Sequence, residues 1–230
     1  FGWSRLIPKW LLDIVKISTI GVHAGMFNPP RCRGRAVFNW SMILNFKKLI
    51  AYAMELKPGI DDGDIFIKEK ILISDQDDIN SLYLKNAILS SSFFLKIIKK
   101  WNYFSKIKKK QNNKNSSYLP KRNPSDSFIN WHLNSRDIYN FVRALKNPYP
   151  NAFTIYKNQI FYILEAIEFD FEYGKYTKPG QIVFKFGNNQ FVIKCKKGFV
   201  LARFKDSKHL NKINVNSLLT SNKKKIKLNY

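Results

Sequence analysis

Residues 36–73 read AVFNWSMILNFKKLIAYAMELKPGIDDGDIFIKEKILI and carry the clearest structural pattern in the chain. Residues 36–46 are rich in bulky apolar side chains and are suited to a buried helix, while residues 50–56 have the length of a strand. The turn-forming residues 57–64 follow, and residues 65–73 alternate apolar and polar side chains as a half-buried strand does. This alternation of helix and strand predicts an α/β layer with a mainly parallel sheet.

The same pattern continues on both sides of this stretch. Upstream, residues 8–15 predict a short helix with Pro8 near its first turn, and residues 18–23 predict a short strand. Downstream, residues 78–104 place apolar side chains at helical spacing and predict one long helix or two. Residues 1–104 are therefore expected to form one α/β domain.

The composition changes after residue 104. Residues 105–118 (SKIKKKQNNKNSSY) have almost no core-forming side chains and predict a linker or exposed loop. A domain of residues 119–204 should follow, with a helix over 135–145 that has Ser135 as its N-cap. Residues 205–230 are expected to be a frayed basic tail. Short β-like runs separated by turns predict a small antiparallel barrel in 119–204, and they span 152–156, 159–169, 181–186, 189–195 and 198–204.

The formal net charge of the 230 residues is +24, from 40 Lys and Arg against 16 Asp and Glu. Such an excess points to nucleic acid or other anions as partners. Only eight of the 40 cations are arginine, so a lysine-rich compositional bias explains the charge equally well. The apolar runs are far shorter than the ~20 residues that span a bilayer. Two cysteines far apart provide neither a disulfide framework nor a zinc quartet.

Two residues that follow predicted strands are the best candidates for chemistry. His23 ends an apolar run and Asp61 follows residues 50–56, so both would reach one cleft if these strands are neighbours. A carboxylate within ~4–6 Å of a histidine favours the imidazolium and raises the histidine pKa. His132 and His209 are expected to be structural and solvated, respectively.

Two other polar clusters each have a structural interpretation beside a functional one. The acidic run of residues 61–64 is a solvated turn or a metal pair, although no histidine lies near it in sequence and the spacing of a calcium loop is absent. The segment Arg31–Arg35 is a solvated loop or an anion site. No phosphate-binding glycine loop is present in the sequence, so a nucleoside triphosphate or dinucleotide role has no support. No nucleophile elbow is present either, so covalent catalysis is the weaker alternative.

Six blocks in the same order carry a family likeness. The chain resembles the 10-formyltetrahydrofolate-dependent formyltransferases, which include methionyl-tRNA formyltransferase and the sugar N-formyltransferases. The blocks are FGWSRLIP (1–8), IGVHAG (20–25), RCRGRAVFNW (31–40), PGIDDGDIFIKEKI (58–71), LPKRNPSDSFINWH (119–132) and DIYNFVRALKNPYPNAF (137–153).

The resemblance implies a Rossmann-like catalytic domain followed by a small barrel-like domain. It also implies that the family's first strands and helices are missing before Phe1. The expected reaction is transfer of a formyl group from the co-substrate 10-formyltetrahydrofolate to a primary amine. No metal ion is expected, and the enzyme should be cytoplasmic.

The resemblance also assigns residues to roles. His23 matches the catalytic histidine and Asp61 matches the carboxylate beside it, but the amide donor of the family's Asn-x-His pattern is replaced by Gly21. Losing one oxyanion donor costs on the order of 10²–10³ in rate. Arg35 would lie near the substrate. The expected folate contacts are Arg5, Leu6, Ile7, Lys57, Pro58, Gly59, Ile60 and Asp61.

The amine acceptor is expected to be a nucleotide-linked amino sugar, because blocks 1–8, 119–132 and 137–153 look more like the sugar branch. Charged initiator tRNA is the alternative, and the basic charge fits it. A degenerate binding module is a third possibility, which the replacement by Gly21 keeps open. The oligomeric state stays open.

Overall fold

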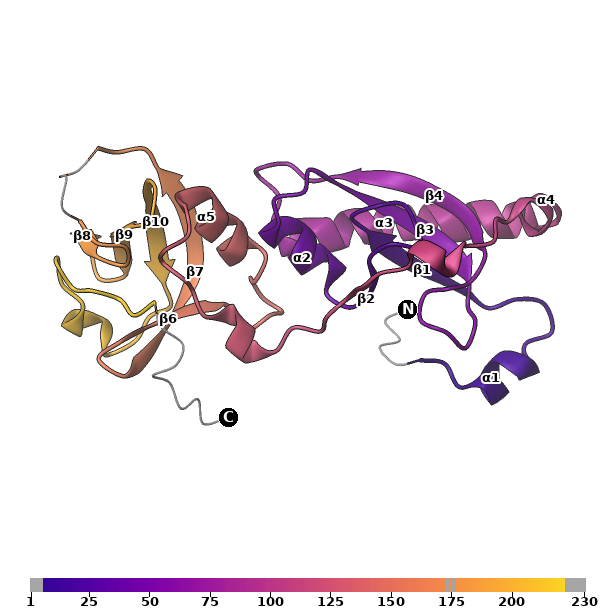
Figure 1. The fold of residues 1–230 in the computed structure, drawn as a ribbon, viewed down its shortest axis with the longest axis horizontal. Coiled ribbons are helices and arrows are strands. Elements are labelled where there is room, and N and C mark those ends of the chain that lie inside the picture. Colours follow the sequence, from indigo (N-terminus) through magenta and orange to yellow (C-terminus); the bar gives the residue numbers. More distant parts are fainter. Residues whose placement is uncertain (1–5, 173, 175–176, 222–230) are drawn as a thin grey trace. The chain divides into compact units, whose positions relative to one another are not determined.

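The computed structural model describes residues 6–172, 174 and 177–221. The chain divides into two compact units between Arg122 and Asn123, and the short segment 42–45 is grouped with the second unit. Unit 1 holds the elements from α1 to β5, and unit 2 holds a separate β-sheet (Figure 1).

The sheet of unit 1 has three strands in the order β1 (Ile20–Gly25), β3 (Lys48–Glu55) and β4 (Ile65–Leu72). Both pairs are antiparallel, so the expectation of a mainly parallel sheet was wrong. The turn between β3 and β4 is too short for the crossover of a dozen or more residues that parallel neighbours need. The connection from β1 to β3 is long enough for such a crossover, yet β3 runs antiparallel to β1.

The helices of unit 1 lie at the predicted positions. They are α1 (Lys9–Ile14), α2 (Val37–Ile43), α3 (Ile79–Lys99) and α4 (Trp101–Ile107), the last two separated at Lys100. Helix α3 packs on β3 and β4 and buries Phe93 and Ile97 completely. The Asp78 carboxylate accepts hydrogen bonds from the first turn of α3, which fixes where this helix begins.

The segment expected to be a linker belongs to unit 1. β2 (Arg33–Gly34) pairs in parallel with β5 (Tyr118–Leu119), and the Arg33 N–H donates to the Ser117 carbonyl at 2.9 Å. A short 3₁₀ helix, η1 (Asn113–Asn115), lies within the same segment. Residues 110–119 are therefore built into the domain and do not separate two domains.

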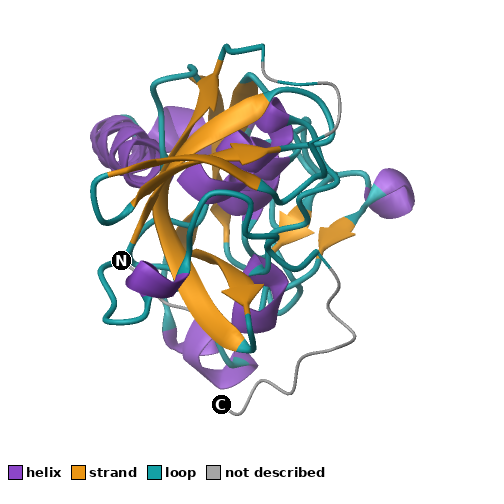
Figure 2. Cartoon of the chain, turned by 90° about the vertical axis from the view of Figure 1, so that its left-hand side faces the viewer, coloured by secondary structure: helices purple, strands orange, loops and turns teal. Residues whose placement is uncertain are grey.

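The sheet of unit 2 has five antiparallel strands in the order β6-β7-β10-β9-β8 (strands orange in Figure 2). The edge strands do not pair with one another, so the expected barrel is not closed. Segment 216–220 instead donates and accepts main-chain hydrogen bonds beside both edges, at Ile155 and at Ile182. The strands are β6 (Ala152–Tyr156), β7 (Gln159–Phe169), β8 (Ile182–Phe186), β9 (Gln190–Lys194) and β10 (Phe199–Phe204).

Two further expectations for unit 2 are corrected. Helix α5 (Ser135–Arg143) has Asn134 as its N-cap, one residue before the expected Ser135, because Asn134 and Asp137 form the reciprocal capping pair. The chain after β10 is packed as far as Ser221, since the apolar side chains of Leu210, Ile213 and Leu219 are buried. The 3₁₀ helices η2 (Pro124–Ser127) and η3 (Leu210–Lys212) complete the elements.

In the part of the chain that the structure describes, no helix is both long enough and apolar enough to cross a membrane.

Candidate active site

His23 lies inside β1, two residues before the end of the strand, and does not open the following loop as expected. Tyr52 on β3 is its partner in register, and the two rings meet edge to face with centroids 5.7 Å apart. The His23 side chain is 15% exposed, which leaves it partly accessible above the sheet. The strand pair therefore holds the imidazole in a fixed orientation.

The loop of residues 57–64 carries Asp61 back to His23. The Asp61 Oδ2 atom lies 3.6 Å from the His23 Nε2 atom, so the structure brings together the two residues expected to be catalytic. The Gly34 N–H donates to the same Oδ2 atom at 3.0 Å, and Asp61 adopts a left-handed backbone conformation with φ of 49°. The strands β1 and β3 are neighbours, as the pairing of these residues requires.

The proton on the imidazole is placed by its oxygen neighbours. The carbonyl oxygen of Cys32 lies 3.4 Å from the His23 Nε2 atom, on the same side of the ring as Asp61. Both neighbours are acceptors, so the neutral ring keeps its proton on Nε2 and has Nδ1 as the basic nitrogen. Among the described residues, no hydrogen-bond partner lies at Nδ1.

Burial, and not Asp61, dominates the charge state of His23. Desolvation lowers the His23 pKa below its usual value of 6.5, although Asp61 and the Cys32 carbonyl raise it and Arg33 lowers it further. The expectation that the carboxylate raises the histidine pKa is therefore corrected in its net direction. The imidazole is neutral at pH 7 and able to accept a proton.

The Tyr52 hydroxyl adds a second buried group beneath this site. It has no hydrogen-bond partner among the described residues, and burial raises its pKa far above the usual value. The phenol is consequently neutral at any physiological pH.

Gly21 lies on the same face of β1 as His23. A Cβ atom at residue 21 would lie 2.5 Å from the Leu56 Cδ2 atom, so the Leu56 side chain fills the space where a longer residue would go. A longer side chain at residue 21 would therefore compete with Leu56 for the same space.

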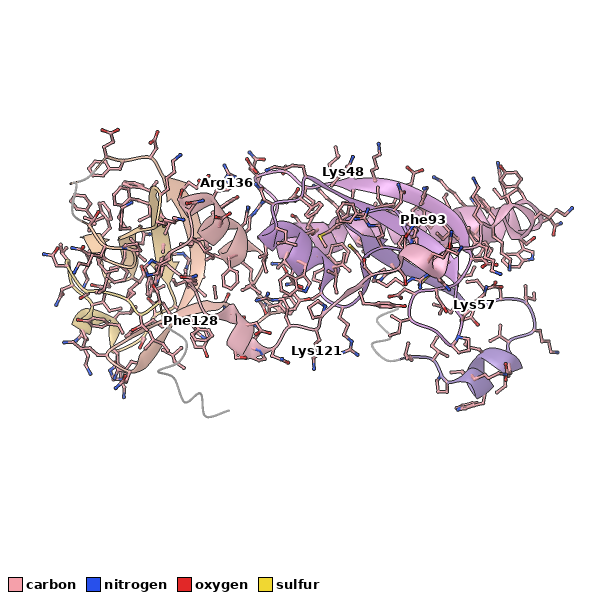
Figure 3. The ribbon with its side chains drawn as sticks, in the orientation of Figure 1. Lys48, Lys57, Phe93, Lys121, Phe128 and Arg136 are labelled. Atoms are coloured by element: carbon pink, nitrogen blue, oxygen red, sulfur yellow. The ribbon has the colours of Figure 1, made fainter. Side chains whose placement is uncertain are left out.

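The loop of residues 57–64 is closed tightly at its base. Lys57 Nζ donates to Asp64 Oδ1 at 2.9 Å, and this hydrogen bond raises the Lys57 pKa (Lys57 is labelled in Figure 3). A Cβ atom at Gly63 would lie 1.5 Å from the Glu55 carbonyl oxygen, so only glycine fits there. The loop that holds Asp61 is therefore shaped by close backbone packing.

The residues expected to bind folate fall into two groups. Lys57, Pro58, Gly59 and Ile60 belong to this loop, where Ile60 is 42% exposed. Leu6 and Ile7 precede α1, with Leu6 59% exposed, and Arg5 lies outside the described residues. Arg35, expected near the substrate, is exposed between β2 and α2.

Sequence reasoning missed two buried residues of the site. Arg33 is 1% exposed and Gln111 is 7% exposed, and the Arg33 Nη2 atom donates to Gln111 Oε1 at 2.8 Å. Gln111 lies in a Lys- and Asn-rich segment where nothing in the pattern marks it as buried. The charged neighbours of Arg33 in sequence likewise suggest a solvated loop.

The other two histidines belong to unit 2. His132 is exposed in unit 2, where its N–H donates to Asn130, and His209 precedes η3. A groove of about 830 Å³ is lined by residues of α3 and α4, among them Ile88, Leu95 and Tyr103, and does not include His23. No cluster of three or more metal-binding side chains occurs within residues 6–172, 174 and 177–221.

Comparison with known proteins points to one family. A model of the formyl transferase C-terminal domain matches residues 121–225. The methionyl-tRNA formyltransferase of Acetivibrio thermocellus is 31% identical over 202 residues, which cover 88% of this chain and 63% of that protein. The chain spans about three fifths of the length of the first curated relatives that it matches.

Two solved structures share the fold. One is WlaRD, a sugar 3N-formyl transferase determined in the presence of dTDP and 5-N-formyl-THF, with a TM-score of 0.61 and 24% identity over 82% of this chain and 65% of WlaRD. The other is HypX from Aquifex aeolicus in complex with tetrahydrofolic acid, with a TM-score of 0.64 and 17% identity over 87% of this chain and 34% of HypX.

Proposed function

We propose that this chain, a homologue of the formyltransferases, transfers a formyl group from 10-formyltetrahydrofolate to a primary amine. The observation that carries this proposal is the His23–Asp61 pair, with 3.6 Å between Nε2 and Oδ2 and with no hydrogen-bond partner at Nδ1 among the described residues. The two folate-bound structures with the same fold support the choice of donor.

His23 moves the proton in this proposal. The amine must lose a proton as its nitrogen bonds to the formyl carbon, and neutral His23 accepts that proton at Nδ1. The Asp61 carboxylate then stabilises the imidazolium from the Nε2 side, across 3.6 Å. His23 returns the proton to the nitrogen atom that the formyl group leaves, so the products are a formamide and tetrahydrofolate.

The donor would supply an activated formyl group, and the residues proposed to hold it are the loop 57–61 with Leu6 and Ile7. Exposed apolar side chains such as Ile60 and Leu6 suit the faces of a flat ring, while loop main-chain groups suit its polar edge. Arg5 belongs to the same expected contact set but lies outside the described residues.

For the acceptor we propose a nucleotide-linked amino sugar. The dTDP-bound sugar 3N-formyl transferase with the same fold supports this choice, and the exposed Arg35 offers a guanidinium for the diphosphate. Methionyl-tRNA is the second candidate. The 31% identical relative favours it, as does the stretch 79–125, which contains eleven Lys and Arg residues and no Asp or Glu.

The test is a transfer assay with labelled 10-formyltetrahydrofolate and the intact protein. Amino sugars linked to dTDP or UDP, charged initiator tRNA and free amino sugars are offered as acceptors at two salt concentrations. Label in the nucleotide sugar supports the proposal. Label in tRNA alone, with activity that falls steeply as salt rises, selects the second candidate. Folate binding without transfer to any acceptor favours a binding module.

A further inference from the structure

Two separate loops contribute the polar groups that face His23. The segment 32–34 supplies the Cys32 carbonyl at 3.4 Å from Nε2 and the Gly34 N–H that donates to Asp61. The loop 57–64 supplies Asp61 itself. The distance between His23 and Asp61 therefore depends on how these two loops are held against each other.

One buried side chain joins the two loops. The Gln111 Nε2 atom donates to the Asp61 carbonyl at 2.9 Å and to the Gly63 carbonyl at 2.8 Å. Its Oε1 atom accepts from Arg33 Nη2 at 2.8 Å, so all the polar atoms of the amide are used. No other hydrogen-bonding group of its size could serve two acceptors and one donor in this way.

Among the described residues, the groups that accept hydrogen bonds from the Arg33 guanidinium are all neutral. Beside Gln111, its Nη2 atom donates to Asn113 Oδ1 at 2.8 Å and its Nη1 atom to the Tyr118 hydroxyl at 3.5 Å. Its Nε atom has no partner within the described residues. Because a buried guanidinium is costly unless it is hydrogen-bonded, its contact with Gln111 is a strong constraint on both.

We propose that Gln111 is the positioning residue for the catalytic pair: with Arg33 it clamps loop 57–64 to segment 32–34 and so fixes Asp61 beside His23. This inference rests on the proposed formyl transfer for its kinetic consequence, but the clamp itself is a structural statement that needs no substrate. Gln111 touches neither His23 nor the Asp61 carboxylate, so its effect is exerted through the backbone.

Three variants separate this role from a general effect on folding. Gln111→Met keeps the volume and removes all three hydrogen bonds, while Gln111→Glu keeps the acceptor for Arg33 and removes both donors to the loop. Asn113→Ala is the matched control, because it removes another partner of Arg33 without touching loop 57–64.

The first readout is hydrogen exchange in the peptide spanning residues 57–64, measured on the intact protein without substrate. Both Gln111 variants should exchange faster there, since the loop loses its anchors, and Asn113→Ala should match the wild type. Equal protection in the wild type and in Gln111→Glu would overturn the proposal, whatever reaction the protein catalyses.

The second readout is kinetic. A displacement of ~1 Å costs on the order of 10²-fold in rate, so kcat of Gln111→Met should fall by about that factor with KM nearly unchanged. The acid limb of the kcat profile should also move to lower pH, because Asp61 raises the His23 pKa. The titratable groups around His23 are Asp61, Arg33, Cys32 and Tyr52, and Gln111→Met leaves all of them in place and adds no charge.

Failure of the positioning role can be distinguished from failure of the proposed formyl transfer. If the wild type transfers no formyl group, the proposed function fails while the exchange experiment still decides whether the clamp exists. If the wild type is active and Gln111→Met has the wild-type kcat and pH profile, the positioning role is refuted although the function stands. Faster exchange of residues 57–64 together with an unchanged pH profile would also contradict the positioning role of Gln111.

Discussion

The substitution Asp61→Asn removes one charge beside His23 and keeps the shape of the side chain. The Asp61 Oδ2 atom lies 3.6 Å from Nε2, and the two side chains are 23% and 15% exposed, so water screens the pair only in part. Coulomb's law at this distance with an effective dielectric constant of about 40 gives ~2 kcal/mol. Because His23 is neutral at pH 7, this energy acts only when the ring becomes protonated during the reaction.

The expected consequence is a fall in kcat of about 30-fold, which is the rate equivalent of ~2 kcal/mol. KM should change little, since the ground state loses no charge pair. The assay is steady-state formyl transfer by the intact protein from pH 5 to pH 9. The acid limb should move to lower pH, because the variant loses the interaction that raises the His23 pKa.

Asp64→Asn is the matched control. Asp64 lies in the same loop and pairs with Lys57 at 2.9 Å. This variant should keep the wild-type pH profile. A kcat for Asp61→Asn within about 3-fold of the wild type, equivalent to less than ~1 kcal/mol, would refute the role of Asp61 as the charge that stabilises the imidazolium.

Three further predictions concern stability. Gly21→Asn should lower the unfolding free energy by about 1–3 kcal/mol, because its side chain crowds Leu56. In urea titration, the double variant Gly21→Asn with Leu56→Ala should lose less stability than the sum of the two single losses, and a loss equal to that sum would contradict the crowding. Burial of Asp77 is outweighed by hydrogen bonds from a lysine and two serines, which lower the Asp77 pKa to about 2. This shift contributes ~2 kcal/mol to the unfolding free energy above pH 4, and the contribution is lost as the pH falls toward 2. In Asp77→Asn this part of the acid dependence of stability should be missing. Gly63→Ala should cost about 3 kcal/mol, because its Cβ would meet the Glu55 carbonyl, and a wild-type urea midpoint would contradict that packing.

The positions of the elements could be predicted because apolar periodicity is a local property. Residues 65–73 alternate at a period of two and residues 78–104 repeat at helical spacing, and the structure has β4 and then α3 and α4 there. Strand direction could not be predicted in the same way. The alternation of helix and strand before β3 is compatible with a return in either direction, and the chain takes the antiparallel one.

The sequence singled out His23 and Asp61 because each stands at the end of a predicted strand or just after it, although His23 lies inside β1. The pKa direction of His23 could not be predicted, because it depends on burial that comes from distant segments. Gln111 was missed for the same reason. Its burial arises because β5 pairs with β2, a contact between residues about 85 positions apart that no local pattern indicates.

The reaction itself is tested most directly by a single-turnover experiment with labelled 10-formyltetrahydrofolate, a dTDP-linked amino sugar and the intact protein in excess. The wild type should deliver the label to the amine with a rate that rises with pH and then levels off, because neutral His23 is the form that accepts the proton. His23→Gln, which keeps a polar side chain of similar size, should bind the folate and lose the transfer. Undiminished transfer by His23→Gln would contradict the account.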